Sequence, residues 1–443
     1  MAATTASRIF AAAYSLLWKA ARPVLRRQQR LARDFDQRLV PSSWALPSPA
    51  ACWIQAASGG EAYLVRQLVR ELAVLLPPAA PAPFTLLATS CTRQGIEVLE
   101  AVRQWAQENA PQILVHVRCF PLDAPEIMDR ALQLASPGAV ALLETELWPG
   151  LMLGCAARHI PVLVLNGRMR EKSLRRYRFL RFIWDIAAPC RVIAASPPDA
   201  RRFAALFGED RVRCAHNIKF DGLGSPDAAQ IALPALADME TGLSLVLLAS
   251  VRQEEEEAMR AALGALFGQD RPVCVVLAPR HMERAAFWAE RLGELAGAYG
   301  WRLLLRSAFA ADEKLAAKTV VLWDAFGELQ ALYGRADAVF VGGSLAPLGG
   351  QNFLEAAAAG VVPVIGPSWS NFAWAGEEFF DAGLARRIDS AAELAPVLLR
   401  QLELAEARDA VRARFDAYLA QRKGGARYMA ERLLEACSAC QSL

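Results

Sequence analysis

Histidine is scarce in this chain, with 4 among 443 residues, and the 9 cysteines include only one closely spaced pair. That pair, Cys437 and Cys440, has no second pair beside it that would complete a tetrahedral zinc site. Other cysteines lie in apolar stretches such as 273–275, which is typical of buried free thiols in a reducing compartment. The sequence therefore predicts no metal site and no disulfide framework.

Charge of one sign and long apolar runs are lacking as well. The formal net charge is only +3, which is too small to indicate a nucleic-acid partner. An apolar segment at 9–18 is well short of the ~20 residues that a membrane-spanning helix needs, and no A-x-A cleavage site marks it as a signal peptide. Asp34 and Asp36 lie in a charged region before any strand, so we interpret their spacing as chance rather than as a metal-binding pair.

The first 40 residues nevertheless differ from the rest of the chain. The segment 9–18 contains Tyr14 and Trp18, and a basic flank follows it. The flank consists of Arg22, Arg26, Arg27, Arg30 and Arg33. This pattern is typical of a helix that lies in, or dips into, the cytoplasmic leaflet of a membrane. An amphipathic helix packed on the protein itself is the alternative.

Short apolar runs alternate with helical segments from Ala51 onwards, which indicates parallel sheets covered by helices on both faces. The runs are 52–57, 84–88, 113–117, 140–143, 162–165 and 192–195, then 245–249, 273–278, 302–305, 320–323, 338–341 and 362–365. Residues 221–243 break this rhythm and are predicted to be a linker. We therefore predict an α/β chain with a segment 1–40 and two doubly wound Rossmann-like domains, 41–225 and 226–443, facing each other across a cleft. Ligands are expected at the carboxyl ends of the strands.

Glycine-rich turns are concentrated in the segment 335–367, which combines a strand, two turns, a helix expected to begin near Asn352, and a further strand. Glycines let backbone N–H groups approach a ligand closely, and a helix start offers unpaired N–H groups to a phosphate. The carboxylate of Glu355 is then suitably placed to accept hydrogen bonds from ribose hydroxyls. We interpret the segment as a nucleotide site; a plain αβ unit with loose turns is the alternative.

This segment, GGSLAPLGGQNFLEAAAAGVVPVIGP at 342–367, resembles the donor-binding segment of the 3-deoxy-manno-octulosonic acid (Kdo) transferases of Gram-negative lipopolysaccharide synthesis. The resemblance covers roughly residues 50–385 and includes ETELWP at 144–149 and PRH-x-ER at 279–284. It implies a GT-B glycosyltransferase that moves Kdo from CMP-Kdo to the lipid A precursor, lipid IVA, with inversion and with neither metal nor cofactor. It also implies a place on the cytoplasmic face of the inner membrane, with its anionic lipids and no nucleic acid as partners.

The resemblance assigns roles to residues of the N-terminal half. Ser58, Gly60 and Glu61 match the segment whose glutamate is the family's proposed general base, although a glutamate at a helix start is also ordinary dipole compensation. The remaining matches are expected to orient the acceptor sugar and to balance charge: Glu144, Glu146, Arg168 and Lys219. A structural ion pair is an equally good interpretation of Lys219. A basic cluster at 172–181 is either a solvated helix face or a surface for lipid phosphates.

In the C-terminal half the resemblance assigns the donor site. Arg280 offers a planar fork to a phosphate or carboxylate. The other donor-binding matches are His281, Phe326, Gly327, Glu328, Ser344, Gly350, Gln351, Asn352 and Glu355. Gln351 stands where the family usually has histidine, and it cannot carry a proton at neutral pH. The alternatives are a soluble nucleotide-sugar epimerase of the same fold and a non-catalytic sugar-nucleotide binding protein, the latter supported only by Gln351.

Overall fold

Two compact units make up the chain. The computed structural model describes residues 5–28, 33–78, 82–223, 239, 242–310, 313–404 and 406–441. The first unit consists of Met1–Gly222 together with Arg422–Leu443, and the second of Leu223–Gln421. Each unit contains one 7-stranded sheet, and every strand pair is parallel. The prediction of two doubly wound α/β units is therefore confirmed.

The sheet of the first unit has the strand order β3-β2-β1-β4-β5-β6-β7. Its strands are β1 (Cys52–Ala56), β2 (Phe84–Ser90), β3 (Ile113–Cys119), β4 (Ala139–Leu143), β5 (Val162–Gly167), β6 (Arg191–Ala194) and β7 (Val212–Cys214). The apolar runs predicted all of them except β7. That edge strand escaped the prediction because it has only 3 residues, of which two are exposed, and so carries no apolar run.

Helices cover both faces of this sheet, because successive side chains of a strand point to opposite sides. Trp53 packs in a core with residues of α5, α6, α8 and α9, whereas Ile54 packs in a second core with residues of α3, α4 and α18. The helices of this unit that follow its first strand are α3 (Gly59–Leu75), α4 (Arg93–Asn109), α5 (Pro125–Ala135), α6 (Pro149–Ala157), α7 (Glu171–Phe179), α8 (Arg181–Ala187), α9 (Pro197–Phe207) and α18 (Gly425–Gln441).

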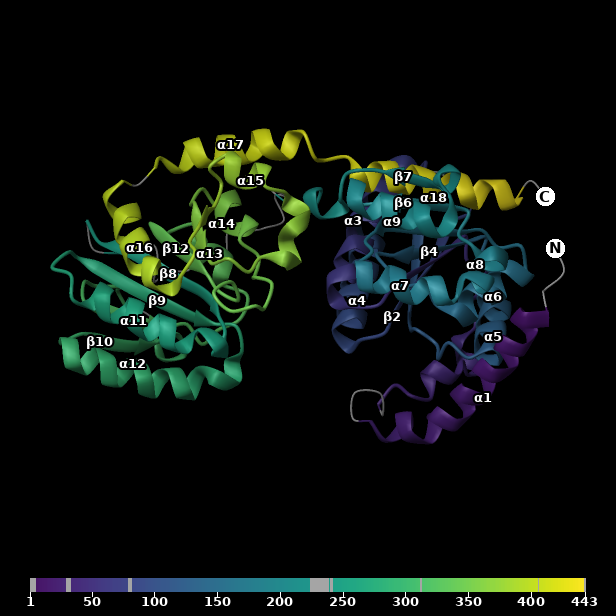
Figure 1. Ribbon diagram of the computed structural model, residues 1–443, viewed down its shortest axis with the longest axis horizontal. Coiled ribbons are helices and arrows are strands. Elements are labelled where there is room, and N and C mark those ends of the chain that lie inside the picture. The colour runs from purple at the N-terminus through teal and green to yellow at the C-terminus, as the bar shows by residue number, and fades with distance from the viewer. Residues whose placement is uncertain are drawn as a thin grey trace. The chain divides into compact units, whose positions relative to one another are not determined.

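The last helix, α18, belongs to the first unit, which corrects the predicted domain 226–443. Met429 and Leu433 are buried in the core that contains α3 (Figure 1). Asp221 fixes the start of α18, since its carboxylate accepts hydrogen bonds from the N–H groups of Gly424 at 2.6 Å and Ala426 at 2.8 Å. An apolar helix face predicts packing on a sheet but does not say which sheet. Most of the predicted linker, 224–238 and 240–241, lies outside the described residues.

The N-terminal helix α1 (Thr5–Arg27) packs on the first unit rather than forming a separate segment. Tyr14 Oη donates to Asp123 at 3.0 Å, and the Arg22 guanidinium lies 2.5 Å from Glu126 at the start of α5 (Figure 1). This packing agrees with the alternative interpretation of the segment, an amphipathic helix packed on the protein itself. Among the helices of the described ranges, none is long and apolar enough to cross a membrane.

The sheet of the second unit has the strand order β10-β11-β9-β8-β12-β13-β14. Its strands are β8 (Ser244–Val251), β9 (Val273–Pro279), β10 (Arg302–Leu305), β11 (Thr319–Leu322), β12 (Ala338–Val341), β13 (Pro363–Ile365) and β14 (Arg386–Arg387). Its helices are α11 (Glu256–Phe267), α12 (Ala285–Tyr299), α13 (Leu329–Tyr333), α14 (Leu354–Ala358), α15 (Glu378–Asp381), α16 (Leu394–Glu403) and α17 (Arg408–Ala420). The apolar runs missed β14, whose two residues are exposed arginines.

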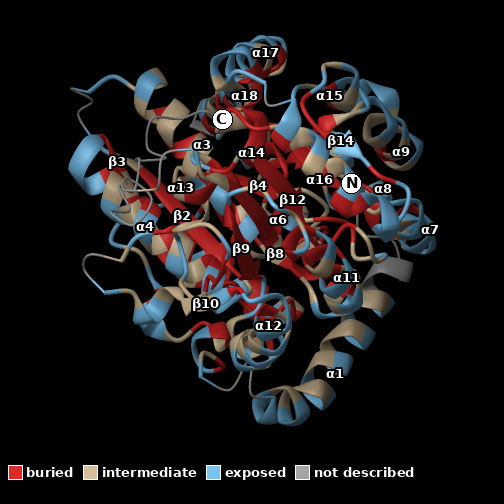
Figure 2. Ribbon diagram, turned by 90° about the vertical axis from the view of Figure 1, so that its left-hand side faces the viewer, coloured by how far each residue is buried: buried red, intermediate tan, exposed pale blue. Residues whose placement is uncertain are grey.

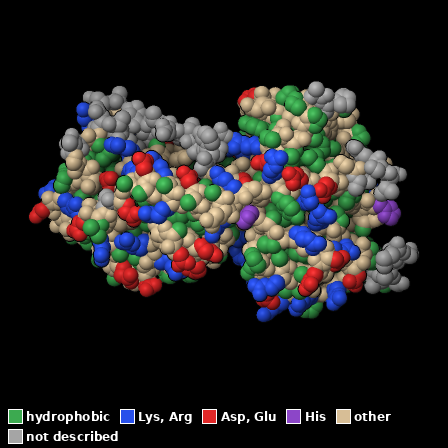
Figure 3. Space-filling view, turned by 90° about the horizontal axis from the view of Figure 1, so that it is seen from above, with side chains coloured by type: hydrophobic (Ala, Val, Ile, Leu, Met, Phe, Trp, Pro, Cys, Tyr) green, Lys and Arg blue, Asp and Glu red, His purple; other side chains and the backbone are tan. Residues whose placement is uncertain are grey.

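Burial follows these layers in both units. The central strands are buried, whereas helices such as α1, α4 and α12 turn exposed residues outwards (Figure 2). On the face seen in Figure 3, the coloured Lys and Arg side chains are interspersed with Asp and Glu. Among the described residues of that face, no broad basic surface of the kind that binds a polyanion is visible.

Candidate active site

In the first unit, the candidate residues lie after the carboxyl ends of neighbouring strands. Glu61 follows β1, the residues 144–148 (the acid loop) follow β4, and Arg168 follows β5. In the sheet, β1 pairs with β4 and β4 with β5. Parallel pairing therefore brings residues from three separate stretches of sequence to one edge, where ligands of such sheets bind.

Glu144 opens the acid loop in a left-handed backbone conformation, with φ 55°. Its carboxylate lies 2.7 Å from Lys219 Nζ and 3.5 Å from an Arg168 nitrogen. The side chains of Glu144 and Lys219 are only 17 % and 26 % exposed, so solvent screens this pair less than a surface pair. One carboxylate of the acid loop thus uses both predicted cations.

Buried Asn166 places Lys219 beside Glu144. Asn166 is the second-last residue of β5 and has φ 53°, and its Oδ1 accepts a hydrogen bond from the Ile218 N–H at 3.1 Å. The 3-10 turn Ile218–Phe220 that begins there carries Lys219. Lys219 was predicted from a motif, but the positioning role of Asn166 depends on a contact between residues 52 apart.

Tyr177 and Arg168 hold the middle of the acid loop. Tyr177 Oη donates to the carbonyl of Thr145 at 2.8 Å, and the Thr145 hydroxyl donates to the Arg168 carbonyl. The loop therefore keeps a defined shape between β4 and α6, which fixes the position of Glu146. Burial, assisted by the charge of Glu144, raises the pKa of Glu146.

Glu61 lies in the first turn of α3, immediately after Ser58 and Gly60. Ser58 caps this helix, and the Glu61 carboxylate accepts from the Ala57 N–H at 2.6 Å and from the Ser58 hydroxyl at 3.2 Å. Burial raises the pKa of Glu61 to about 7, and the nearby charges of Glu146 and Glu144 act in the same direction.

The charges of this cluster add to the effect of burial on the pKa of Glu61. Glu144 occupies the two cations Arg168 and Lys219, whereas neither Glu61 nor Glu146 forms an ion pair with any residue that the structure describes. A carboxylate with a pKa near neutral accepts a proton efficiently at physiological pH. The arrangement therefore suits Glu61 to work as a general base.

In the second unit, the glycine-rich loop 342–345 follows β12 and is held by Glu255. This buried carboxylate accepts hydrogen bonds from the N–H groups of Gly343 at 2.7 Å, Ser344 at 2.9 Å and Leu345 at 2.9 Å. It also accepts from the Arg252 N–H at 3.0 Å. Successive N–H groups of this kind form an anion-binding nest, and here a side chain of the protein occupies it.

Occupation of the nest corrects the expectation that these glycines present free N–H groups to a ligand. The Ser344 hydroxyl is also used internally, since it donates to the Val341 carbonyl at 2.6 Å and accepts from the Gly366 N–H at 2.9 Å. Both Ser344 and Glu255 therefore shape the loop rather than present polar atoms to solvent. No local sequence pattern marks Glu255 for this role, because its partners lie some 90 residues further on.

Three predicted donor residues remain available to a ligand. The Asn352 amide donates to Glu355 Oε1 at 2.6 Å, and the solvent-facing Glu355 is the second residue of the short helix α14. Densely packed protein surrounds the carboxyl group although the side chain reaches solvent, and this desolvation raises the pKa of Glu355, while Asn352 and the charge of Arg280 oppose that rise. Arg280 follows β9 and is exposed, and no ion pair within 4 Å holds it among the described residues.

The other donor candidates lie in turns of the same unit. Gly350 donates to the Gly343 carbonyl at 2.7 Å, and the Gln351 N–H donates to Gly342 at 3.1 Å, so these two turns are joined. His281 lies 3.6 Å from Glu283 and is exposed.

In the turn before α13, some residues are packed against the protein and others face solvent. Glu328 forms a two-pronged pair with Arg306 at 2.8 and 2.9 Å, so its carboxylate is already used. Phe326 is 75 % exposed, and Gly327 has a positive φ of 84°. Within this turn, Phe326 and the backbone of Gly327 are the groups that face solvent.

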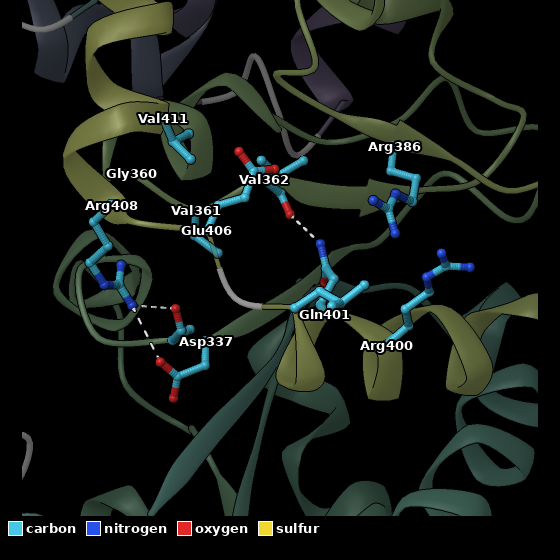
Figure 4. A pocket seen from close by; sticks show the side chains of 12 residues that line it. Asp337, Gly360, Val361, Val362, Arg386, Arg400, Gln401, Glu406, Arg408 and Val411 are labelled. Atoms are coloured by element: carbon cyan, nitrogen blue, oxygen red, sulfur yellow. Dashed lines mark hydrogen bonds and ion pairs between the residues drawn. The ribbon is translucent and has the colours of Figure 1, made fainter.

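A separate hollow lies at the amino ends of β12 and β13, lined by Asp337, Val362, Gln401 and Arg408 (Figure 4). Gln401 donates to the Val362 carbonyl at 2.7 Å, and Arg408 donates to the Tyr333 carbonyl at 3.1 Å. The first bond attaches α16 to the residue before β13, and the second attaches α17 to the end of α13, at the edge of the unit opposite to the one that carries Arg280 and Glu355. We assign the hollow to packing.

The two seven-stranded parallel α/β units define a GT-B-like fold. A glycosyltransferase of *Rickettsia africae* has the same fold, with a TM-score of 0.56 at 13% identity over 89% of this chain and 99% of that structure. A UDP-GlcNAc 2-epimerase of *Neisseria meningitidis* matches with the same TM-score at 12% identity, over 87% of this chain and 98% of that structure. Fold alone therefore does not separate transferases from epimerases.

The sequence comparisons separate them. Residues 26–222 match the family described as 3-Deoxy-D-manno-octulosonic-acid transferase (kdotransferase). A 3-deoxy-D-manno-octulosonic acid transferase of *Bordetella pertussis* is 30% identical over 351 residues, which are 78% of this chain and 78% of that protein. The chain belongs to the Kdo transferase family and is a glycosyltransferase, as the sequence motifs predicted.

Proposed function

We propose that this protein transfers Kdo from CMP-Kdo to the lipid A precursor, lipid IVA, in lipopolysaccharide biosynthesis. The observation that carries the proposal is the acidic cluster in the first unit of this Kdo transferase family member. In that cluster, Glu61 has a pKa of about 7 and Glu144 is paired with Lys219. The first unit would bind the acceptor and the second unit the donor.

In the proposed reaction, Glu61 accepts the proton of the acceptor hydroxyl as that oxygen attacks the anomeric carbon of Kdo. The bond to the CMP phosphate breaks, and CMP leaves with the electron pair. A single displacement of this kind inverts the anomeric centre. Arg280, Asn352 and Glu355 bind the donor, with Gln351 beside them where the family usually has histidine.

The reaction as proposed uses no metal ion. In the part of the chain that the structure describes, no group of three His, Cys, Asp or Glu side chains is arranged to hold a metal ion. The departing phosphate would be stabilised instead by Arg280, whose guanidinium is free of ion pairs among those residues. Activity that persists in the presence of a chelator would support this part of the proposal.

We also propose that α1 binds the cytoplasmic surface of the inner membrane. The outer face of this helix exposes Ile9, Leu16, Leu17 and Val24, each between 62% and 66% exposed. These positions recur at about two helical turns, so they form one apolar stripe on the side away from Tyr14. The basic residues of α7 and the 85% exposed Phe179 at its end offer a second contact for anionic lipids.

Donor selection tests the proposed reaction. Purified full-length protein is incubated with lipid IVA in detergent and with either CMP-Kdo or UDP-GlcNAc, and the released nucleotide is measured. We expect CMP release that requires the lipid, and no turnover of UDP-GlcNAc. Conversion of UDP-GlcNAc without lipid would instead identify an epimerase, and binding of CMP-Kdo without turnover would identify a non-catalytic protein.

A further inference from the structure

Two hydrogen bonds from neighbouring residues of α1 reach different targets. Ser15 Oγ donates to Glu126 at 2.9 Å, in the first turn of α5. Tyr14 Oη donates to Asp123 at 3.0 Å, just before α5. The Ser15 bond only attaches α1 to its neighbour, whereas the Tyr14 bond ends on a carboxylate that also contacts another element.

Asp123 caps the helix α6 from outside that helix. Its carboxylate is 1% exposed and accepts hydrogen bonds from the N–H groups of Gly150 and Leu151, both at 2.8 Å. The residue before α6, Trp148, supplies no side-chain cap of its own. Gly150 permits the close approach, because a Cβ there would overlap the Asp123 carbonyl.

Tyr14 is the third donor to this buried carboxylate. Burial raises the pKa of Asp123 to about 7, and its three hydrogen bonds act against that rise. A buried carboxylate depends on its donors for stability, so the loss of one alters how firmly it holds the others.

The helix that Asp123 caps begins directly after the acid loop. Glu146 lies three residues before Pro149, the first residue of α6. The opposite end of the loop is held by the pair between Glu144 and Lys219. The position of Glu146 therefore depends on both anchors, of which one is linked through Asp123 to α1.

We propose that Tyr14 and Asp123 are positioning residues for the acceptor, which join the N-terminal helix to the acid loop through the start of α6. This inference rests on the proposed function of the acid loop as part of the acceptor site. It gives α1 a second role besides the proposed membrane contact, because Tyr14 lies on the face of the helix that packs on the protein.

Full-length Tyr14→Phe tests the proposal, with Ser15→Ala as the matched control. Both variants lose one hydrogen bond between α1 and the α5 region and keep the apolar outer face. Transfer is measured on detergent-dispersed lipid IVA, so that membrane binding does not limit the rate. We expect Tyr14→Phe to raise the acceptor KM about 3- to 10-fold, the scale of one hydrogen bond, with an unchanged KM for CMP-Kdo. Ser15→Ala should match wild type in both constants.

Asp123→Asn provides a second variant that keeps the shape of the side chain but leaves one of its three donors without an acceptor. Its acceptor KM should rise at least as much as that of Tyr14→Phe, while flotation of all three variants with vesicles stays at the wild-type level. Equal acceptor KM values in Tyr14→Phe and Ser15→Ala would overturn the inference alone. A wild-type protein that transfers no Kdo would instead overturn the proposed function on which it rests.

Discussion

Replacing Glu61 with Gln tests two consequences of one partly buried carboxyl group, one for turnover and one for stability. The variant keeps the size of the side chain but cannot take the proton of the acceptor. Turnover is therefore expected to fall ~10²-fold or more, the usual scale of general base catalysis. Donor binding should be kept, because the proposed donor residues belong to the second unit.

The same substitution should stabilise the protein at high pH. The pKa of Glu61 rises from an ordinary 4.5 to about 7, and each pKa unit corresponds to ~1.4 kcal/mol. The ionised carboxylate therefore destabilises the folded state by at most ~3.5 kcal/mol. Because the side chain is partly open to solvent, we expect about 1–2 kcal/mol.

The sign of the pH dependence follows from where the proton is bound. Below about pH 4.5 the carboxyl is protonated in the folded and unfolded states, and it imposes no penalty. Between about pH 4.5 and 7 only the unfolded chain releases the proton, so the wild type loses stability as the pH rises. Above about pH 7 the penalty is complete. Gln cannot ionise, so the stability of Glu61→Gln relative to wild type should increase over this window.

Urea unfolding at about pH 5 and about pH 8 measures this difference, with the transition of each unit followed separately where they do not coincide. Glu97→Gln is the control, since Glu97 is 62% exposed and pairs only with Arg93 on the surface of α4. The hydrogen bonds from Ala57 and Ser58 favour the ionised carboxylate, so their pH-dependent part is already contained in the raised pKa. An equal stability difference at both pH values would refute the raised pKa, and near-normal turnover would remove Glu61 from the mechanism.

Arg280→Ala and Glu355→Ala should each weaken CMP binding by ~1.5–3 kcal/mol in a calorimetric titration, the range for hydrogen bonds to charged groups; unchanged affinity in both would move the nucleotide site elsewhere. Glu255→Gln turns an amide group towards N–H donors, so we expect a lower melting temperature of the second unit and weaker CMP binding. Wild-type values of both quantities would contradict the role of Glu255 in holding the glycine-rich loop. Leu16→Ser combined with Leu17→Ser should reduce flotation with anionic vesicles while detergent activity is kept; full flotation at high salt would place the membrane contact outside α1.

The sequence predicted the sheets well because central strands are buried on both faces. Runs such as 245–249 are apolar throughout, so their type and order can be recognised without any knowledge of tertiary contacts. β7 and β14 lie at sheet edges and are short and partly polar, so they carry no such signal. The placement of α18 in the first unit was also missed, since it depends on which sheet its apolar face meets.

The site was predictable as a set of residue types but not as a set of contacts. The motifs placed Glu61 and the acid loop after strands, where parallel pairing brings them together. They did not show that Glu144 takes Lys219 as its partner, 75 residues away. Nor did they show that the buried carboxylate of Glu255 fills the N–H nest at 343–345. Such pairings depend on long-range packing, which local sequence patterns do not encode.

Mass spectrometry of the lipid product tests the central claim most directly. Full-length wild type and Glu61→Gln are each incubated with CMP-Kdo and lipid IVA in detergent. The lipid is then extracted, and its mass is compared with that of the unreacted acceptor. The account predicts that the lipid of the wild-type sample gains the mass of one Kdo residue, and that the amount of this product equals the amount of CMP released in the first transfer. With Glu61→Gln the same product should appear more slowly. An acceptor that keeps its mass while correctly folded wild-type protein and CMP-Kdo are present would contradict the account.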